Sequence, residues 1–594
     1  MQPDTPRTER KAFFARLRTE PGFLLRHIGT LACAVFRRLR TTLVVWRSGA
    51  HQGRRIQPVW LDAATCAVGS GPPAAARSLV LPTYPCGAAA CADAVTPAFP
   101  ELSTSNDPED YFGRQRWGFL THSLLAGKLD WEERLADCVH WVETHADKTD
   151  PAWETYSSCE RVANLLVFLA AMQSTPRAAS VPRPLRVFLQ DSLGWILRHL
   201  EYYGSRDTNN HIINNARALV MAGAALEDST ARAAGMQIFR QCLPRLIMEG
   251  GFLRERSSHY QVIVLNWVLD AWWFLGVCDD PGSEGRKFLG DHVERMIAAT
   301  SMICERGARL LALIGDVSPD LTPPQSLARL KRLYADVWPP STQPRAGVRL
   351  TDGWFRMASE ESVLLGNFPA GSFPAGFPTH GHADLTSFVW LHGGKEVLVD
   401  RGRYRYTPDA ISAFQKSAAG HNLPLVNGFA PLCESLVATG QWWPLPYAAA
   451  RLEALVSRAG VVLAHDGFAR ATPVLHHSRQ LGLEQDSLVV VDSFVGAGTV
   501  ELGFCWHFGV GFDTFDARRM TVTGSDGRID LHVEGVVGSA RAAIVSGKTP
   551  GGWISRAYGQ RELALGICLR WQVKLPSQVS TRFSLARCER QPVR

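Results

Sequence analysis

Two histidines and an aspartate stand at alternate positions in the segment His380-Gly381-His382-Ala383-Asp384. In an extended chain these side chains would share one face, and such a cluster is unusual outside a metal or catalytic site. Asp400 and His421 follow further along the chain. Because two histidines and an aspartate form a reasonable ligand set for zinc, this part of the sequence indicates a metal site, a catalytic site or both.

The spacing of these residues does not by itself bring the ligands together. If Gly393-Gly394 is a two-residue hairpin turn, Asp400 pairs opposite Ser387. His382 would then lie about 17 Å further along a straight strand and on the opposite face. A site that contains both His382 and Asp400 therefore requires a bulge or a loop between His382 and Ser387.

A second group of polar residues stands where a helix should begin. Asn209 is predicted as the N-cap, a position that favours asparagine, and Asn210 and His211 would lie in the first turn. The free N–H groups and the dipole at a helix N-terminus favour an anion. These residues could bind a substrate carboxylate, or they could serve only to cap the helix.

A third group runs from Gly250 to Tyr260 and enters an apolar segment that is typical of a helix. Tyr260 would open that helix. A tyrosine in such a position usually packs against its neighbours and keeps its hydroxyl in water, so Tyr260 gains interest only from the groups around it.

Helices are predicted between residues 107 and 338, where apolar residues recur at helical spacing. Antiparallel helices joined by short loops suggest a toroid, although the spacing alone does not separate a toroid from other helical arrays. Residues 1–106 are predicted to form a helical and irregular arm. The predicted helices are Tyr111–Leu125, Trp131–His145, Ser158–Met172, Leu185–Tyr203, Ile212–Leu226, Ala231–Met248, Tyr260–Val277 and Phe288–Cys304.

A proline-rich connector at 337–344 marks the predicted domain boundary. After it, at 346–594, short alternating segments separated by Gly and Asp turns predict an antiparallel β domain, most simply a sandwich of two sheets. The predicted strands are Ser387–Leu391, Glu396–Asp400, Gly460–His465, Leu488–Asp492, Thr499–Phe504, Met520–Thr523 and Arg528–Val533.

The composition excludes some partners and leaves others open. The net charge of +7 is compatible with an acidic substrate or with none, and the absence of a dense basic stripe argues against nucleic acid. The 13 cysteines show no spacing typical of a metal site or a disulfide framework.

The apolar stretch from Phe23 to Phe36 is interrupted by Arg26 and is too short to span a membrane. The oligomeric state stays open, with a dimer as one option.

Taken together, these segments resemble the heparinase II/III-like polysaccharide lyases in their order and residue types. The helical part matches around Asn210-His211 and Ser257–Tyr260, and the β part matches at His380–Asp384, Val399–Gly402 and His421-Asn422. The resemblance implies an incomplete α/α toroid followed by an antiparallel β-sandwich. It also implies elimination across the C4–O bond of a uronate, in which the carboxylate is neutralised while the C5 proton leaves.

The resemblance also implies roles for particular residues. Asn210 and His211 would bind the uronate carboxylate or assist proton transfer. Tyr260 would be the principal acid and base, and His380 would support the charge that develops. Tyr404 is a second candidate for acid–base chemistry. Because free tyrosine has a pKa of about 10, a basic tyrosine needs a cation or a hydrogen bond close by.

Three further residues are predicted to contact the substrate or assist the tyrosine. Arg256 and Arg403 are the nearby cations, although each could equally be a solvated charge. Asn214 stands where several members of the family carry glutamate, which suggests a substrate other than heparin. Arg401 stands where proline is common in the family, which would alter the turn that leads to Tyr404.

By the same resemblance, His382, Asp400 and His421 would hold a structural zinc ion. The expected function is that of a lyase acting on an acidic uronate-containing polysaccharide, such as a glycosaminoglycan, alginate or exopolysaccharide. The alternative is a catalytically silent glycan-binding protein of exopolysaccharide handling. The resemblance implies a place in the cell envelope or periplasm; without a clear signal peptide, the cytoplasm is the alternative.

Overall fold

The structure is a computed structural model, and it describes most of the chain from residue 107 onward. Of the predicted N-terminal arm, only residues 79–84 fall within the described part, where the N–H of Val80 donates to the carbonyl of Ala225 at 2.9 Å. The rest of the arm lies outside the described residues. The described ranges are 79–84, 107–127, 130–175, 180–204, 208–278, 282–305, 310–338, 346–369, 371–372, 380–407, 409–432, 451–457, 460–484, 487–547 and 549–586.

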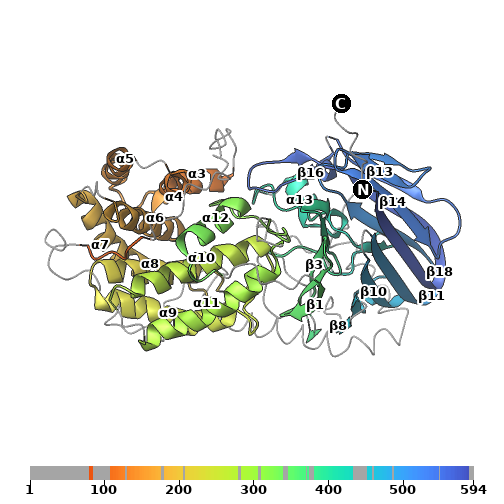
Figure 1. The fold of residues 1–594 in the computed structure, drawn as a ribbon, viewed down its shortest axis with the longest axis horizontal. Coiled ribbons are helices and arrows are strands. Elements are labelled where there is room, and N and C mark those ends of the chain that lie inside the picture. The colour runs from red at the N-terminus through yellow and green to blue at the C-terminus, as the bar shows by residue number, and fades with distance from the viewer. Residues whose placement is uncertain are drawn as a thin grey trace, which may run out of the picture.

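The first half of the chain is helical, and its helices lie against one another as an array (Figure 1). Helix α8 is central, because it contacts α6, α7, α9 and α10. The helices are α3 (Pro108–Gln115), α4 (Gly118–Ala126), α5 (Trp131–Thr144), α6 (Thr155–Gln173), α7 (Arg183–Arg198), α8 (His211–Ala225), α9 (Ser229–Leu246), α10 (Ser258–Leu275), α11 (Glu284–Met302) and α12 (Pro323–Leu333).

Two departures from the predicted helices have local causes. The block Tyr111–Leu125 is broken into α3 and α4 at Trp117, which adopts a left-handed backbone with φ of 54°. Helix α12 was not predicted from apolar spacing. It begins at a capping box, in which the Thr322 hydroxyl accepts from the Gln325 N–H and the Gln325 side chain accepts from the Thr322 N–H.

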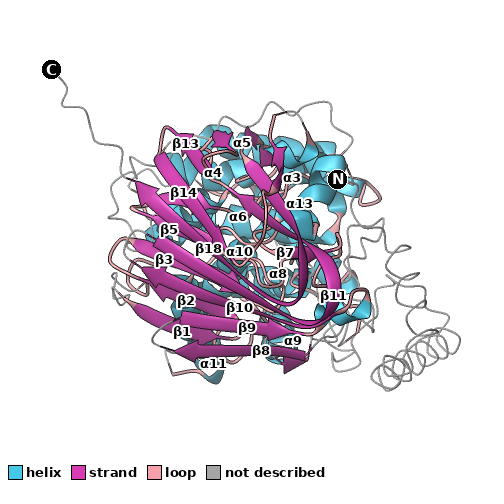
Figure 2. Cartoon of the chain, turned by 90° about the vertical axis from the view of Figure 1, so that its right-hand side faces the viewer, coloured by secondary structure: helices cyan, strands magenta, loops and turns pink. Residues whose placement is uncertain are grey.

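The second half of the chain forms antiparallel sheets (Figure 2). Within the described residues, one sheet has the strand order β1-β2-β3-β5-β6, and the larger sheet has the order β12-β13-β14-β18-β11-β10-β9-β8-β4 with β15 beside β18 and β7 beside β11. The strands are β1 (Gly347–Thr351), β2 (Trp354–Ala358), β3 (Ser362–Asn367), β4 (Gly371–Ser372), β5 (Val389–His392), β6 (Lys395–Leu398), β7 (Pro424–Val426), β8 (Arg451–Ser457), β9 (Gly460–His465), β10 (Val474–Glu484), β11 (Ser487–His507), β12 (Thr514–Asp516), β13 (Thr521–Gly524), β14 (Gly527–Glu534), β15 (Arg541–Val545), β16 (Trp553–Ile554), β17 (Glu562–Leu563) and β18 (Gly566–Ala586).

The two large sheets share a core. Phe355, Leu364 and Trp390 of the smaller sheet belong to the same buried apolar cluster as Val490 and Ile567 of the larger one. A second apolar cluster fills the helical half and extends to Trp354, Leu365 and Val389 of the smaller sheet. The predicted fold class, a helical toroid followed by an antiparallel β-sandwich, therefore agrees with the arrangement of the elements.

The predicted domain boundary at residue 338 lies between α12, which ends at Leu333, and β1, which begins at Gly347. Among the described residues, no helix combines the length and the apolar character needed to cross a membrane.

The segment that follows His382, residues 383–388, is a loop and not a strand. Gly393 and Gly394 form the predicted two-residue turn, with φ of 57° and 77°, between β5 and β6. Strand β5 begins only at Val389. The preceding residues turn at Thr386, which has φ of 70°, and the Ser387 N–H donates to the Asp384 carbonyl at 2.8 Å. The loop required between His382 and Ser387 is therefore present.

Candidate active site and metal group

Asn210 and His211 lie at the start of helix α8. The Oδ1 of Asn209 accepts the His211 N–H at 3.1 Å, so Asn209 supplies the local capping interaction. Asn210 directly precedes the helix in an αR conformation, and its side chain makes no capping hydrogen bond. Capping therefore does not explain why asparagine stands at position 210.

Asn210 is instead tied to Glu255, a residue that the sequence did not mark. The Asn210 backbone N–H donates to Glu255 Oε1 at 2.9 Å, and Asn210 Nδ2 donates to Glu255 Oε2 at 2.7 Å. Both residues are buried. Because an amide nitrogen carries two hydrogens, Asn210 retains one donor for a ligand. Its Oδ1 is buried and has no hydrogen-bond partner among the described residues.

His211 forms an ion pair with Glu201, whose carboxylate lies 2.8 Å from His211 Nδ1. Asn215 fixes that carboxylate, since its Nδ2 donates to Glu201 Oε2 at 3.0 Å. Burial favours a lower pKa for His211, but the Glu201 carboxylate outweighs it and raises the pKa to about 9. The imidazole is therefore a cation at neutral pH, and its side chain is 36% exposed, which leaves it within reach of a ligand.

Tyr260 lies in the first turn of α10, where the Ser257 hydroxyl accepts its N–H at 3.1 Å. Its hydroxyl forms a short hydrogen bond with the hydroxyl of Tyr406 from the β domain. The His380 ring stacks on the Tyr260 ring, with centroids 3.5 Å apart and planes 8° apart. Burial is the largest influence on the pKa of Tyr260 and holds it well above its usual value, so the phenol is neutral in the free protein.

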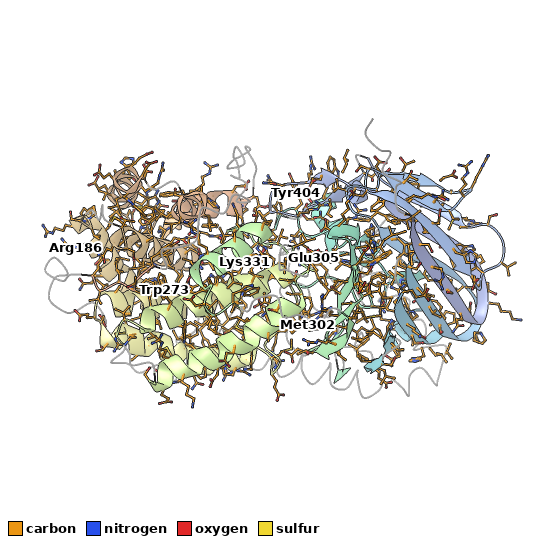
Figure 3. All side chains as sticks on the ribbon, viewed as in Figure 1. Arg186, Trp273, Met302, Glu305, Lys331 and Tyr404 are labelled. Atoms are coloured by element: carbon orange, nitrogen blue, oxygen red, sulfur yellow. The ribbon has the colours of Figure 1, made fainter. Side chains whose placement is uncertain are left out.

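Tyr406, and not Tyr404, is the second tyrosine beside Tyr260. Tyr404 lies at the junction of the helical and β domains (Figure 3) and packs between Arg405 and Arg561, whose guanidinium carbons are 5.0 and 5.1 Å from its ring. No contact between Tyr404 and Tyr260 is recorded among the described residues. In an extended segment residues 404 and 406 would share one face, so the sequence alone did not separate the two tyrosines.

Tyr406 is held by a chain of contacts between the two domains. The Tyr558 hydroxyl accepts the Tyr406 N–H at 2.7 Å and donates to Asp107 Oδ2 at 2.8 Å. Asp107 precedes α3, whose Glu109 N–H donates to its other carboxylate oxygen at 3.1 Å. The first described helix of the toroid is therefore connected, through Tyr558, to the loop that carries Tyr406.

Asp316 joins the candidate catalytic histidine to the metal group. Its Oδ2 lies 3.2 Å from His380 Nδ1, and its Oδ1 lies 2.8 Å from His382 Nε2. Burial would raise the pKa of Asp316, but Lys416 and Arg403 outweigh it and keep the pKa well below its usual value. Asp316 is therefore ionised and accepts hydrogen bonds from both rings. No sequence pattern marks this residue, which lies in the loop between α11 and α12.

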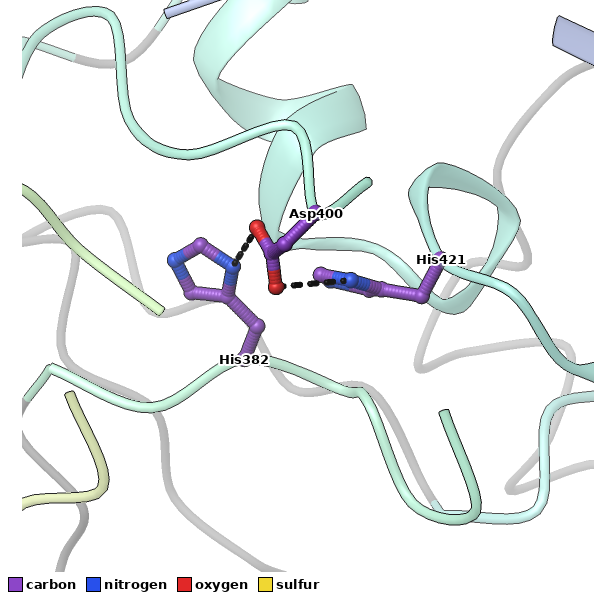
Figure 4. A group of neighbouring side chains, drawn as sticks. All are labelled: His382, Asp400 and His421. Carbon is purple, nitrogen blue, oxygen red and sulfur yellow. Dashed lines mark ion pairs between the residues drawn. The ribbon is translucent and has the colours of Figure 1, made fainter. Parts of the chain in front are cut away.

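His382, Asp400 and His421 meet in a buried group (Figure 4), and ligand atoms of the three lie within 4.8 Å of one another. Nδ1 of His382 lies 3.8 Å from Asp400 Oδ1, and Nδ1 of His421 lies 3.3 Å from Asp400 Oδ2. Gly402 follows in a left-handed turn with φ of 66°, where an added Cβ would lie 2.1 Å from the Ser555 carbonyl oxygen. Glycine at 402 is thus required where the chain leaves Asp400.

The group has the chemistry of a metal site. An ionised Asp316 can only accept, so His382 Nε2 must carry the proton and Nδ1 must present its lone pair toward Asp400. This Nδ1 is buried and has no hydrogen-bond partner among the described residues. A lone pair and a carboxylate that face each other in a buried space repel unless a cation lies between them. The three residues could therefore hold a metal ion.

The three residues predicted to contact substrate occupy buried positions. Asn214 accepts from Arg217 Nη1 at 3.2 Å inside the helical domain, and Arg256 forms a 2.7 Å ion pair with Asp384. Arg403 lies nearer the tyrosines, with its guanidinium carbon 5.2 Å from the Tyr406 ring centroid. The structure brings Arg403 to the tyrosine pair and gives Asn214 and Arg256 partners elsewhere. Their contact with substrate stays a prediction.

The chain is similar to known proteins both in the sequence of its β domain and in its fold as a whole. Residues 344–583 match the family model described as heparinase II/III-like, C-terminal. A crystal structure of heparinase III is 14% identical, with a TM-score of 0.58 over 92% of this chain and 89% of that one. A mutant of heparan sulfate lyase HepC from Pedobacter heparinus is 17% identical, with a TM-score of 0.53 over 82% of this chain and 78% of that one. Comparison with curated proteins gives no match.

At these identities the likeness to solved structures concerns the fold, and it confirms the predicted order of a helical region followed by antiparallel sheets. The family match falls on the domain that carries His380, the metal group and Tyr406. Residues 344–583 therefore match the C-terminal domain of the heparinase II/III-like family.

Proposed function

We propose that this protein is a polysaccharide lyase that cleaves an acidic, uronate-containing polysaccharide by β-elimination. One observation carries the proposal. The hydroxyls of Tyr260 and Tyr406, one from each domain, form a hydrogen-bonded pair. His380, which stacks on Tyr260, lies 3.6 Å from the Glu255 carboxylate that binds Asn210 next to the His211 cation. Such a site offers proton transfer next to a place for a carboxylate.

The elimination needs a carboxylate that is neutralised while the C5 proton leaves, because negative charge spreads into that carboxylate. In the proposed reaction, the free N–H of Asn210 and the protonated His211 bind the uronate carboxylate. Both donors are in place before the substrate arrives, since Glu255 holds Asn210 and Glu201 holds His211. Preorganised donors of this kind need no reorientation as charge develops.

The tyrosine pair would carry the protons. One phenolate oxygen takes the C5 proton, and the paired phenol gives its proton to the departing O4. Because burial opposes formation of a phenolate at Tyr260, nearby positive charge must offset that cost. Arg403 is the cation in position to do so, with its guanidinium carbon 5.2 Å from the Tyr406 ring, and the His380 ring stacks on Tyr260.

The proposed metal ion is zinc, which His382, Asp400 and His421 would hold. Its part in the reaction would be structural: it would fix the loop that carries His380 relative to the loop that leads from Asp400 to Tyr406. Asp316 would serve both sites, because it orients His382 as a ligand and holds His380 under Tyr260.

The direct test is a panel of acidic polysaccharides, comprising heparin, heparan sulfate, hyaluronan, alginate and bacterial exopolysaccharides. We expect ultraviolet-absorbing unsaturated uronate ends from at least one of them. Tyr260→Phe should abolish the signal and lower the melting temperature only slightly, because it removes one hydrogen bond, worth about 0.5–1.5 kcal/mol. Binding of a glycan by the wild-type protein without unsaturated ends would favour the silent glycan-binding alternative. Near-wild-type turnover by Tyr260→Phe would overturn the assignment of Tyr260.

A further inference from the structure

Two cysteines face each other across the middle of the larger sheet. Cys505 on β11 and Cys568 on β18 are register partners in the antiparallel pairing of these strands. Their Sγ atoms lie 3.2 Å apart, and the two residues are 2% and 1% exposed. Neither residue belongs to the candidate active site or to the metal group.

The strand register places this pair in the geometry that suits a cross-link. The Cys505 N–H donates to the carbonyl of Leu423 at 3.1 Å, on the side of β11 away from β18. The N–H and C=O of one strand residue point to the same side, so Cys505 and Cys568 form a non-hydrogen-bonded pair. In such pairs the Cα atoms are about 4.5 Å apart and the side chains come closest.

That separation lies within the range of Cα distances found in disulfides, about 4.4–6.8 Å. An S–S bond is about 2.05 Å long, so each sulfur has to move by only about 0.6 Å from the observed separation of 3.2 Å. A bond between the two residues therefore needs no rearrangement of the backbone.

We propose that Cys505 and Cys568 form a cross-strand disulfide by thiol–disulfide exchange with a small-molecule or protein disulfide. In the first step the Cys568 thiolate attacks a sulfur of the oxidant, which forms a mixed disulfide and releases one thiolate. Cys505 then loses its proton and attacks the Cys568 sulfur, which releases the second thiol. The two protein thiols lose two electrons and two protons, and the oxidant's disulfide gains them as two thiols.

The electrostatics of the pair favour this order of attack. The hydrogen bond from the Cys505 thiol lowers the pKa of Cys568; burial opposes the shift, but with the help of Arg570 the pKa falls to about 7. The pKa of Cys505 is raised, so Cys568 is the better nucleophile.

Burial determines when the bond can form. Ala383, Ala418 and Leu423 form one small buried apolar cluster with the two cysteines. An oxidant reaches the pair before these residues cover it, as the sheet assembles, and a reductant is excluded afterwards. Ala383 and Leu423 lie next to the metal-binding loops, so the bond would fix the surface on which those loops rest.

The experiment refolds the full-length reduced chain in a glutathione redox buffer, alkylates it in denaturant without reductant, and maps the peptides by mass spectrometry. We expect a linked pair of peptides that contain Cys505 and Cys568, with a mass lower by two hydrogens than the sum of the reduced peptides. Cys138, which is also buried and has no thiol contact within the described part of the chain, is the matched control and should be alkylated as a single peptide.

Thermal unfolding provides a second, independent measurement. Oxidised protein should melt higher than reduced protein by on the order of 5 °C, because the bond closes a long loop. Cys505→Ala should remove this difference, and Cys138→Ala should keep it. Folded protein in which Cys505 and Cys568 are alkylated separately, or are linked to other cysteines, would overturn the proposal. Should Cys505→Ala fail to fold, the peptide map of the wild-type chain still decides.

Discussion

Replacing Asn210 by alanine should reduce turnover by about 100- to 1000-fold and should also reduce stability. The change removes the side-chain donor assigned to the uronate carboxylate, and loss of one preorganised donor costs about 100- to 1000-fold in turnover, or about 2.7–4 kcal/mol. It also removes the hydrogen bond from Nδ2 to Glu255, and a hydrogen bond to a charged group contributes about 1.5–3 kcal/mol. The backbone N–H of residue 210 still donates to Glu255, so the carboxylate keeps one partner.

Asn209→Ala is the matched control for this prediction. It deletes the side chain that accepts the His211 N–H and leaves the contacts between Asn210 and Glu255 intact. Loss of such a capping interaction costs about 0.5–2 kcal/mol of stability, and we expect turnover to stay close to wild type. The two variants should therefore show comparable losses of stability and very different turnover.

The assay follows the absorbance of unsaturated uronate ends on any polysaccharide that the wild-type protein cleaves, together with melting curves for both variants. The loss in Asn210→Ala should appear mainly in kcat, because the amide would act more strongly on the enolate-like state than on the ground-state carboxylate. A destabilised but fully active Asn210→Ala would refute the carboxylate-binding role. Equal loss of turnover in Asn209→Ala would show that the start of the helix as a whole, and not one donor, controls activity.

Three further predictions concern the remaining groups of the site. Tyr406→Phe should lower turnover by about 100- to 10,000-fold, the usual contribution of general acid–base catalysis, whereas Tyr404→Phe should leave turnover nearly unchanged. A large loss of turnover in Tyr404→Phe, with little loss in Tyr406→Phe, would favour the role that the sequence predicted for Tyr404. Metal analysis of protein purified without added metal should find one zinc ion per chain, and His382→Ala should lose it. Metal that persists in His382→Ala would show that His382, Asp400 and His421 are not the ligand set. KM should rise as pH passes about 9, because His211 loses its proton there and with it the charge that binds the carboxylate. Glu201→Gln should shift this rise to lower pH, and a KM independent of pH and of Glu201 would contradict the role of the cation.

The fold could largely be predicted from sequence because apolar residues recur at helical spacing in the helices and alternate with polar residues in the strands. Strand β9 was predicted with its observed ends, Gly460 and His465. The predicted strands Leu488–Asp492 and Thr499–Phe504 are instead parts of the single long strand β11. Gly496 and Gly498 between them indicated a turn, but the structure uses this stretch as an irregularity in the pairing with β18. Glycine alone does not distinguish a turn from a bulge.

The candidate site could be predicted only where its residues lie in compact motifs. The His380–Asp384 segment and the start of α8 stand out because several chemically active side chains lie close together in sequence. Asp316 approaches His380 from 64 positions away, and no local pattern distinguishes it from any other loop aspartate. Tyr404 and Tyr406 both lie in the right loop, and only the packing of the loop against Tyr558 and Arg561 decides which of them reaches Tyr260.

The contact through Tyr558 has a consequence for how the protein would turn over a polymer. A long chain that enters between the domains would have to part them, and parting them separates Asp107 from the Tyr558 hydroxyl that also holds the Tyr406 N–H. Domain opening and loss of alignment between the two tyrosines would then be a single event. Substrate would load and product would leave only in a state that has no reactive tyrosine pair. The rate of that gating motion would therefore place a ceiling on turnover that no change in the chemical groups could raise.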